Sequence, residues 1–380
     1  MVFGARLLSR MRINMSNVDH KGPKALKPLR LRDRDAIITK EGIIFRVYGY
    51  FHPLNAFICD AEYGPTKIFQ STNPKAFRAR GKQIHYKFYS DEGIRFIQTK
   101  YPQYRIFCEP LQELIVGVSQ HQIRETRKPN EKFQQLMTKP PTDSLHMALQ
   151  TMSTTVMESS GLSLHSFGVF GSLLHGFYHP QFSDLDLIVY GRKNFRKLRQ
   201  SLEAMYKERA SPLQNEFAST EVIKTKPWNF FNYRPKEYVW HQKRKTIYAL
   251  FNDRQSGRTI KTEFEPVKNW NEIQNEYRPD TRILRKGWIK AVVRITGDQD
   301  AAFMPSIYQT ETMKVLHGEK AEDIRRIISY MEEFRMQVRK DEKAYVEGNL
   351  EQVNTLAESY RQITLTYAPR YYEQVLKTYP

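Results

Sequence analysis

GVFGSLLHGFYHPQFSDLDLIVYG, residues 168–191, is the stretch that decides how the central part of this chain folds. Asp184 and Asp186 stand two positions apart in an apolar run, so a strand there would project both carboxylates from one face. Two neighbouring carboxylates repel each other unless a cation lies between them, and oxygen-only ligation suits Mg²⁺. The segment therefore predicts a strand that carries a metal-binding carboxylate pair.

Gly171 and Ser172 lie upstream, at the end of a short strand predicted within SFGVFGS, residues 166–172. A glycine there lets backbone amides approach an anion closely, and the serine hydroxyl adds a hydrogen-bond donor. Such a turn can hold the outer phosphates of a triphosphate. Together with the carboxylate pair, it meets the needs of nucleotidyl transfer, in which metal ions activate a hydroxyl and neutralise the leaving group.

These residues also carry a family resemblance. Gly171-Ser172, then eleven residues, then Asp184-x-Asp186 in an apolar strand, resembles the signature of the DNA-polymerase-β-like nucleotidyltransferase superfamily. Most of the chain is also similar to an archaeal group of predicted nucleotidyltransferases, for example through RDAIITKEGIIFRVYGYFHP, residues 34–53. The resemblance implies two Mg²⁺ ions, with Mn²⁺ as an alternative, a nucleoside triphosphate substrate such as ATP, and release of pyrophosphate.

The resemblance further implies a third carboxylate on a later strand. Glu263 in KTEFEPVK, residues 261–268, stands where the superfamily often carries aspartate. By resemblance, Asp184 and Asp186 would bridge both metal ions, and Glu263 would help to deprotonate the acceptor hydroxyl. Glu265 is two residues further on and shares the same strand face, so the choice between the two glutamates stays open.

The charge of the chain indicates an anionic partner. Sixty Lys and Arg against 41 Asp and Glu give a net charge of +19, which attracts polyanions such as nucleic acid. Residues 222–248 interleave aromatic and basic side chains, the combination that a single-stranded RNA surface needs. The candidate RNA contacts are Trp228, Tyr233, Arg234, Lys236, Trp240, Lys243 and Arg244. An amphipathic segment with its aromatic side chains in the core explains the pattern equally well.

Arg192 and Lys193 follow the carboxylate strand and could contact phosphates, although such residues more often begin an exposed helix. RNA, whether transfer RNA, ribosomal RNA or another, is the preferred acceptor, and a protein side chain or a small molecule remains open. The rival hypothesis is a non-catalytic RNA- or ribosome-binding protein that retains the fold. A third is a toxin-like enzyme that modifies transfer RNA or a protein.

Other classes of protein are disfavoured by composition. Cys59 and Cys108 are the two cysteines, and the chain has no CxxC and no Cys/His cluster, so we expect neither a disulfide scaffold nor zinc or haem. No apolar stretch approaches the ~20 residues of a membrane span. The Arg-rich residues 1–15 weakly resemble a transit peptide, but Met11 and Met15 also permit a later start, which we favour. We therefore expect a cytoplasmic protein.

The overall prediction is a multidomain α+β protein with a central nucleotidyltransferase α/β domain. Its parts are a flexible basic arm (1–34), an α+β domain (35–125), the nucleotidyltransferase domain (140–270) and a mainly β domain (280–380). The charged, Pro-bearing segment 124–141 is predicted to be a linker.

Several elements are predicted within these parts. Ser90 is expected to cap a short helix, and Thr142 or Asp143 a longer one that ends at Gly161. Residues 245–252 and 258–267 are expected to form a hairpin. Near the C-terminus, residues 321–340 show helical spacing, and 344–353 are predicted to form a hairpin that turns at Gly348-Asn349.

Overall fold

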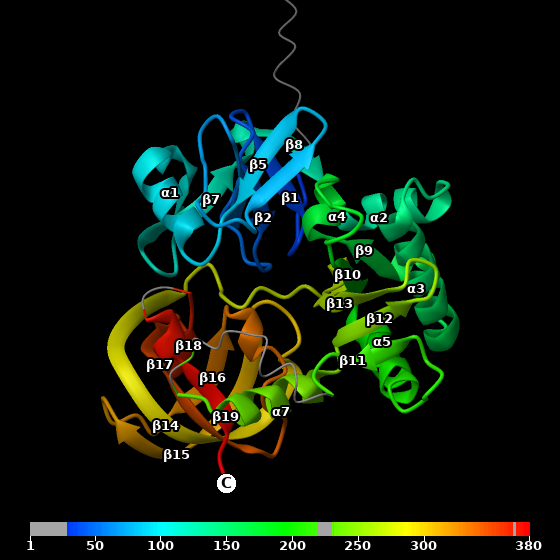
Figure 1. Ribbon diagram of the computed structural model, residues 1–380. Helices are drawn as coiled ribbons and strands as arrows, with labels where there is room; N and C mark the ends of the chain where they lie inside the picture. Colours follow the sequence, from blue (N-terminus) through cyan, green and yellow to red (C-terminus); the bar gives the residue numbers. More distant parts are fainter. Residues whose placement is uncertain (1–28, 219–229, 231, 368–369) are drawn as a thin grey trace, which may run out of the picture. The chain divides into compact units, whose positions relative to one another are not determined.

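The computed structural model describes residues 29–218, 230, 232–367 and 370–380 (Figure 1). Residues Leu31–Pro380 form one compact unit that combines several sheets with few helices. The predicted α+β class is therefore confirmed. None of the described helices is both long and apolar enough to cross a membrane.

The first sheet is antiparallel and has the order β4-β5-β3-β2-β1-β8, with β7 joined to β3 and β6 to β7. Its elements are β1 (Ala36–Thr39), β2 (Ile44–Val47), β3 (Ala56–Pro65), β4 (Phe77–Arg80), β5 (Gln83–Lys87), α1 (Glu92–Lys100), β6 (Arg105–Cys108), β7 (Glu113–Ser119) and β8 (Ile123–Arg127). The β1–β2 hairpin turns through Gly42, whose φ of +87° suits glycine. Helix α1 is preceded by Asp91 as its N-cap residue, so the predicted cap at Ser90 is wrong.

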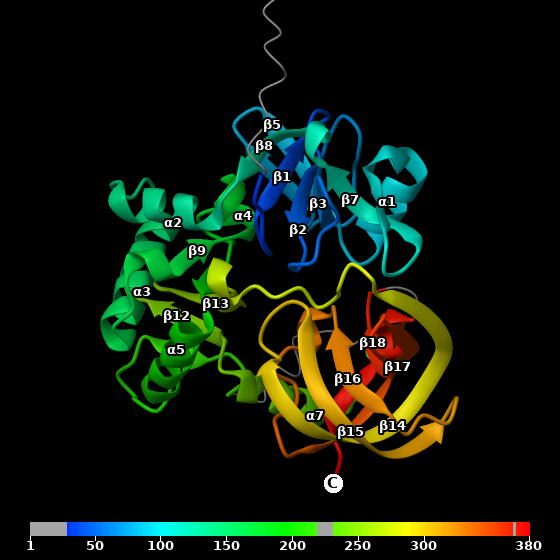
Figure 2. The same ribbon diagram turned by 180° about the vertical axis from the view of Figure 1, so that it is seen from behind.

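The central sheet has the order β11-β12-β13-β10-β9, in which β10 and β13 are parallel. Its elements are α2 (Pro129–Thr138), α3 (Ser144–Ser160), β9 (Phe167–Val169), α4 (Gly171–His175), β10 (Leu185–Tyr190), α5 (Arg192–Met205), β11 (Leu213–Asn215), β12 (Tyr248–Asp253) and β13 (Arg258–Val267). Helices α3 and α5 pack against each other, and α5 also contacts β10 (Figure 2). The apolar side chains of β10 join this core, and Asp186 is the one carboxylate within the strand.

The predicted ends of α3 are confirmed. The side chain of Asp143 accepts a hydrogen bond from the backbone N–H of His146 at 2.9 Å, which satisfies one of the free donors in the first turn. Gly161 ends the helix in the left-handed conformation, with φ of +63°. The predicted hairpin of β12 and β13 is also present.

The third sheet is a curved arrangement with the order β14-β15-β16-β18-β17-β19, and β14 also pairs with β17. This pairing closes β14, β15, β16, β18 and β17 into a barrel, with the long β14 curving around it (Figure 1). The elements are α7 (Pro235–Lys245), β14 (Arg282–Asp300), β15 (Ser306–His317), β16 (Ile324–Ser329), β17 (Lys343–Asn354), β18 (Ser359–Leu365) and β19 (Val375–Thr378).

Two predictions in this region are wrong. Residues 324–329 form β16 rather than a helix, because their isoleucines pair with β15 and β18 and are buried between them. Gly348 lies within β17 rather than at a hairpin turn. A Cβ added there would lie 2.5 Å from Cδ2 of Leu365, so the glycine permits close packing instead of a turn.

The predicted linker and arm are also shorter than expected. Residues 129–138 form α2, in which Pro129 occupies the first turn and Phe133 and Leu136 are buried. Leu31 and Arg34 are buried as well, so the ordered fold begins before Asp35. The sequence pattern predicted neither α2 nor the earlier start of the fold, because isolated buried residues among charged ones show no clear periodicity. Residues 1–28 of the predicted arm lie outside the described part of the chain.

Candidate active site

Asp186 and Glu263 occupy paired positions on adjacent strands. Parallel pairing of β10 with β13 sets Asp186 opposite Glu263, so both side chains leave the same face of the sheet about 5 Å apart along the hydrogen-bonding direction. Asp184 immediately precedes β10 and is exposed. Because of this register, an acid some eighty residues further along the chain lies beside the aspartates.

Gly171 lies directly against the carboxylate of Asp186. The backbone N–H of Phe170 donates to the carbonyl oxygen of Asp186 at 3.1 Å, and Gly171 then turns into α4 with φ of +58°. A Cβ added to Gly171 would lie 2.9 Å from Oδ2 of Asp186. A larger residue would therefore be strained by its backbone and would crowd the carboxylate. Ser172 follows in α4 and is partly buried.

The site concentrates negative charge. Burial, followed by repulsion from Glu263 and then Asp184, raises the pKa of Asp186 from 3.8 to about 8. A cation at this position would oppose both the burial and the repulsion that raise the pKa of Asp186.

Lys261 supplies one positive charge to this site. Its Nζ lies 2.5 Å from Oε1 of Glu263, and both side chains are partly buried. Within the described parts of the chain, no three His, Cys, Asp or Glu side chains are gathered closely enough to hold a metal ion. The donors nevertheless fit Mg²⁺ chemically, because they are carboxylates that repel each other and lie beside the Gly171 turn.

Glu265 has a different environment from Glu263. It is buried and forms ion pairs with Arg34 at 2.7 Å and with Arg335. Burial opposes its ionisation, yet Arg335 and Arg34 together lower the pKa of Glu265 below its ordinary value. Its carboxylate is thus already neutralised by two arginines.

These ion pairs connect all three sheets. Arg34 precedes β1 and also pairs with Glu332 at 2.8 Å, and Glu332 in turn pairs with Arg46 of β2 at 2.8 Å. Glu265 belongs to β13, while Glu332 and Arg335 follow β16. The network therefore joins the N-terminal sheet and the barrel to the strand that carries Glu263.

Glu263 lines one cavity, and a second cavity shares part of that lining. One of about 180 Å³ is lined by residues that include Lys261, Glu263 and Tyr248. A second, of about 470 Å³, shares Tyr238, Glu332 and Glu333 with the first. Its other lining residues include Tyr89, Phe230, Tyr367, Tyr371 and Tyr372. Space for an aromatic ring thus adjoins the cavity that Glu263 lines, a feature that the sequence pattern did not reveal.

The candidate RNA contacts divide into several groups. Tyr233 is a core residue: its ring is buried and its hydroxyl accepts from the backbone N–H of Leu376 at 3.0 Å, so the prediction that it stacks on RNA is wrong. Trp228 lies outside the described residues. Arg234, Lys236, Trp240 and Lys243 are exposed. Arg244 is partly buried, and its guanidinium lies 4.3 Å from the centre of the Trp240 ring.

Comparison with known proteins supports the resemblance. A model of the nucleotidyltransferase domain family matches residues 157–248, which include α4, β10 and α5 but end before Glu263. The chain is also 24% identical over 358 residues to the uncharacterized protein MJ1086 of Methanocaldococcus jannaschii, covering 92% of this chain and 99% of that protein. No solved structure matches the chain.

The matched segment spans the glycine–serine turn and both aspartates, and the structure sets Gly171 against the carboxylate of Asp186. Residues 157–248 thus identify a nucleotidyltransferase domain of the DNA-polymerase-β-like superfamily in this chain.

Proposed function

We propose that this protein transfers a nucleoside monophosphate from a nucleoside triphosphate to a hydroxyl group of RNA in a metal-dependent reaction. The observation that carries the proposal is the placement of the Asp186 carboxylate between Glu263 on the neighbouring strand and the Gly171 turn. Carboxylates for cation binding and a backbone turn for phosphates are thereby brought to one point.

Each side chain has a part in this reaction. The backbone at Gly171 and the hydroxyl of Ser172 would hold the outer phosphates. Asp184, Asp186 and Glu263 would hold Mg²⁺, which supplies charge neutralisation and activates the acceptor hydroxyl. Glu263 would take the hydroxyl proton as the oxygen bonds to the α-phosphorus, and the bond to the β-phosphate breaks to release pyrophosphate. Glu263 is preferred over Glu265, because the latter is paired with Arg34 and Arg335.

RNA is the acceptor that charge favours. The chain carries a net charge of +19, and exposed basic and aromatic side chains follow one another along α7. The cavity lined by tyrosines, which adjoins the cavity that Glu263 lines, would suit the base of the incoming nucleotide, since aromatic rings stack on any base.

Binding of Mg²⁺ should depend on pH through Asp186. The ion binds the carboxylate form, and the pKa of Asp186 is about 8 without it, so each ion bound near pH 7 should displace a proton. The apparent affinity should therefore rise with pH and level off above about pH 8. Calorimetric titration in two buffers of different ionisation enthalpy measures the released protons. Release of no protons at pH 7 would contradict this account.

The proposed activity can be tested with the full chain, Mg²⁺, each labelled nucleoside triphosphate in turn and total RNA. We expect label in RNA, with pyrophosphate formed in equal amount. Label in the protein fraction would instead indicate a protein acceptor. The Asp186→Asn variant serves as the inactive control, because it changes one carboxylate oxygen to an amide with little change of shape.

The alternative is a non-catalytic RNA-binding protein that retains the fold. It is favoured by the ion pair of Lys261 with Glu263, which already supplies a positive charge to this carboxylate. If the alternative is correct, wild type and Asp186→Asn should bind RNA equally well, and neither should transfer label.

A further inference from the structure

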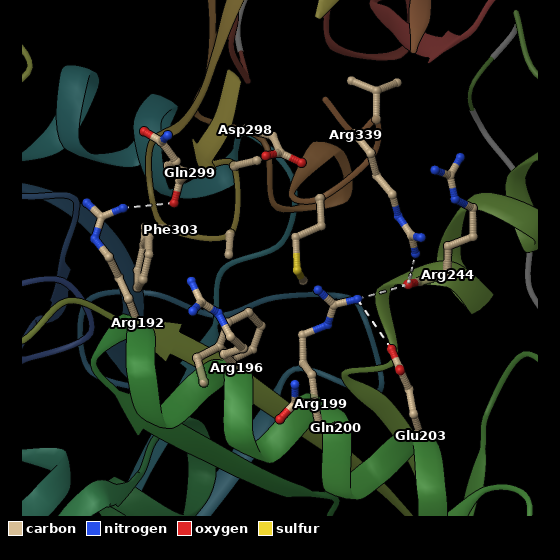
Figure 3. Close-up of a pocket in the computed structure, with 15 residues that line it drawn as sticks. Arg192, Arg196, Arg199, Gln200, Glu203, Arg244, Asp298, Gln299, Phe303 and Arg339 are labelled. Atoms are coloured by element: carbon tan, nitrogen blue, oxygen red, sulfur yellow. Dashed lines mark hydrogen bonds and ion pairs between the residues drawn. The ribbon is translucent and has the colours of Figure 1, made fainter. Parts of the chain in front are cut away.

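A cationic pocket lies between α5 and the barrel, outside the carboxylate site. Its volume is about 700 Å³, and Figure 3 shows Arg192, Arg196 and Arg199 projecting into it from α5. Arg244 and Arg339 line the opposite side. Glu203 and Asp298 are the acids among its lining residues. The excess of arginine makes an anionic occupant favourable.

The spacing along α5 explains why these arginines meet. Positions 192, 196 and 199 lie four and three residues apart, so they share one helix face. Arg192 is held by Asp300 at 2.6 Å and by the carbonyl oxygen of Gln299 at 2.8 Å. Arg196, by contrast, is exposed and has no ion pair or hydrogen bond among the described residues. Its guanidinium can therefore bind an anionic ligand without breaking a hydrogen bond or ion pair within the described residues.

On the far side of the pocket Arg244 forms an ion pair with Glu342, but its guanidinium is not fully hydrogen-bonded. Arg339 donates to the carbonyl oxygen of Arg244 at 3.0 Å, and Nη1 of Arg244 is buried and makes no hydrogen bond to the described residues. Burial lowers the pKa of Arg199, and the charge of Arg339 lowers it further despite Glu203. Anionic oxygens in the pocket would relieve this crowding and would satisfy the free donor.

The surroundings of the pocket favour a nucleic acid over a small polyphosphate. Trp240 is 48% exposed and stacks on Arg244, so an aromatic face adjoins the pocket. Lys236, Trp240 and Lys243 are exposed on α7 at spacings of four and three residues, which extends the cationic surface along one helix face. Alternating stacking and phosphate contacts are typical of single-stranded binding.

We propose that this arginine pocket binds the phosphodiester backbone of the single-stranded RNA acceptor, with a base stacked on Trp240. This inference rests on the proposed function for the identity of the acceptor. Arg192 follows Asp186 by six residues, so the pocket begins no more than about 20 Å from the carboxylates along the chain. A strand of several nucleotides could therefore contact the pocket while its terminal hydroxyl reaches Glu263.

The test measures binding of a fluorescent single-stranded RNA of about 15 nucleotides to the full chain without triphosphate. We expect Arg196→Glu to weaken binding about tenfold or more, and Arg196→Ala to reduce the slope of log affinity against log salt by about 0.7. The matched control is Lys197→Glu, which makes the same charge change at an exposed neighbour on α5 outside the pocket. It should alter binding less than about threefold.

Three outcomes would overturn the proposal: equal effects of Arg196→Glu and Lys197→Glu, no RNA binding by wild type, or displacement of RNA by inorganic triphosphate at equal phosphate concentration. Measuring RNA binding with the Arg196 variants in the Asp186→Asn protein separates binding in the pocket from nucleotidyl transfer. If RNA binding depends on Arg196 but the wild-type protein transfers no nucleotide, the proposed function is refuted and the pocket proposal stands. Transfer to RNA that is unchanged by Arg196→Glu would refute the pocket alone.

Discussion

Asp186→Asn should reduce nucleotidyl transfer by about 10³-fold while stabilising the metal-free protein. The loss is expected because the amide cannot replace a carboxylate that binds Mg²⁺. The gain in stability follows from the raised pKa of Asp186. The pKa of Asp186 is near 3.8 in the unfolded chain and about 8 in the folded protein. At pH values between these two, the folded protein holds a proton on this carboxyl group that the unfolded chain releases. Stability is therefore lost as pH rises through this range, and the asparagine variant avoids the loss.

The measurement is thermal unfolding at several pH values with and without Mg²⁺. At pH 8 without metal, the variant should melt about 2–4 °C above wild type, and the difference should vanish below about pH 4. Added Mg²⁺ should raise the melting temperature of wild type more than that of the variant. Asp184→Asn is the matched comparison, because Asp184 is exposed and its charge contributes less to the raised pKa of Asp186 than burial and Glu263 do: it should lose activity with a smaller gain in stability. A variant that is less stable than wild type at pH 8 would contradict the electrostatic account.

Glu265→Gln should lower the free energy of unfolding by about 3–5 kcal/mol, because it leaves two buried arginines without their shared carboxylate. Arg34 and Arg335 come from different parts of the chain, so the three sheets should also separate more readily. Urea unfolding followed by tryptophan fluorescence measures the change. Limited proteolysis would show whether the links between the sheets become accessible.

Glu263→Gln is the matched control for this experiment. It makes the same chemical change two residues away on the same face of β13, where the pair with Lys261 is partly exposed. Its cost in stability should stay below about 1 kcal/mol, while nucleotidyl transfer should be lost. The opposite result, a stable Glu265→Gln protein and an unstable Glu263→Gln protein, would reverse the roles assigned to these two glutamates.

Local sequence patterns were sufficient to predict many of the helix ends, turns and strands of the central domain. The cap at Asp143, the end of α3 at Gly161 and the hairpin of β12 and β13 depend on neighbours within a few residues, so residue type alone predicts them. The spacing of Gly171-Ser172 and the aspartates similarly predicted a turn and a strand that the structure shows side by side. Such features can be predicted locally, because the residues that produce them lie close together in the sequence.

The barrel was harder to predict. Residues 324–329 carry isoleucines at positions that suit either a helix or a strand, and pairing with β15 and β18 decided between them. Gly348 was predicted to make a turn, whereas its actual role is to allow Leu365 to approach across the sheet. The sequence did not predict the arginine pocket, which exists because Arg244 and Arg339 face the arginines of α5 from elsewhere in the chain.

The sequence by itself determined the glycine–serine turn, the aspartate pair and the strongly positive charge, since these follow from residue type and short spacing. Tertiary structure alone decided which glutamate lies beside Asp186, because parallel pairing of β10 with β13 selects Glu263 while Arg34 and Arg335 neutralise Glu265. The physical reason is that strand register and buried ion pairs depend on groups far apart in the chain, which no local pattern records.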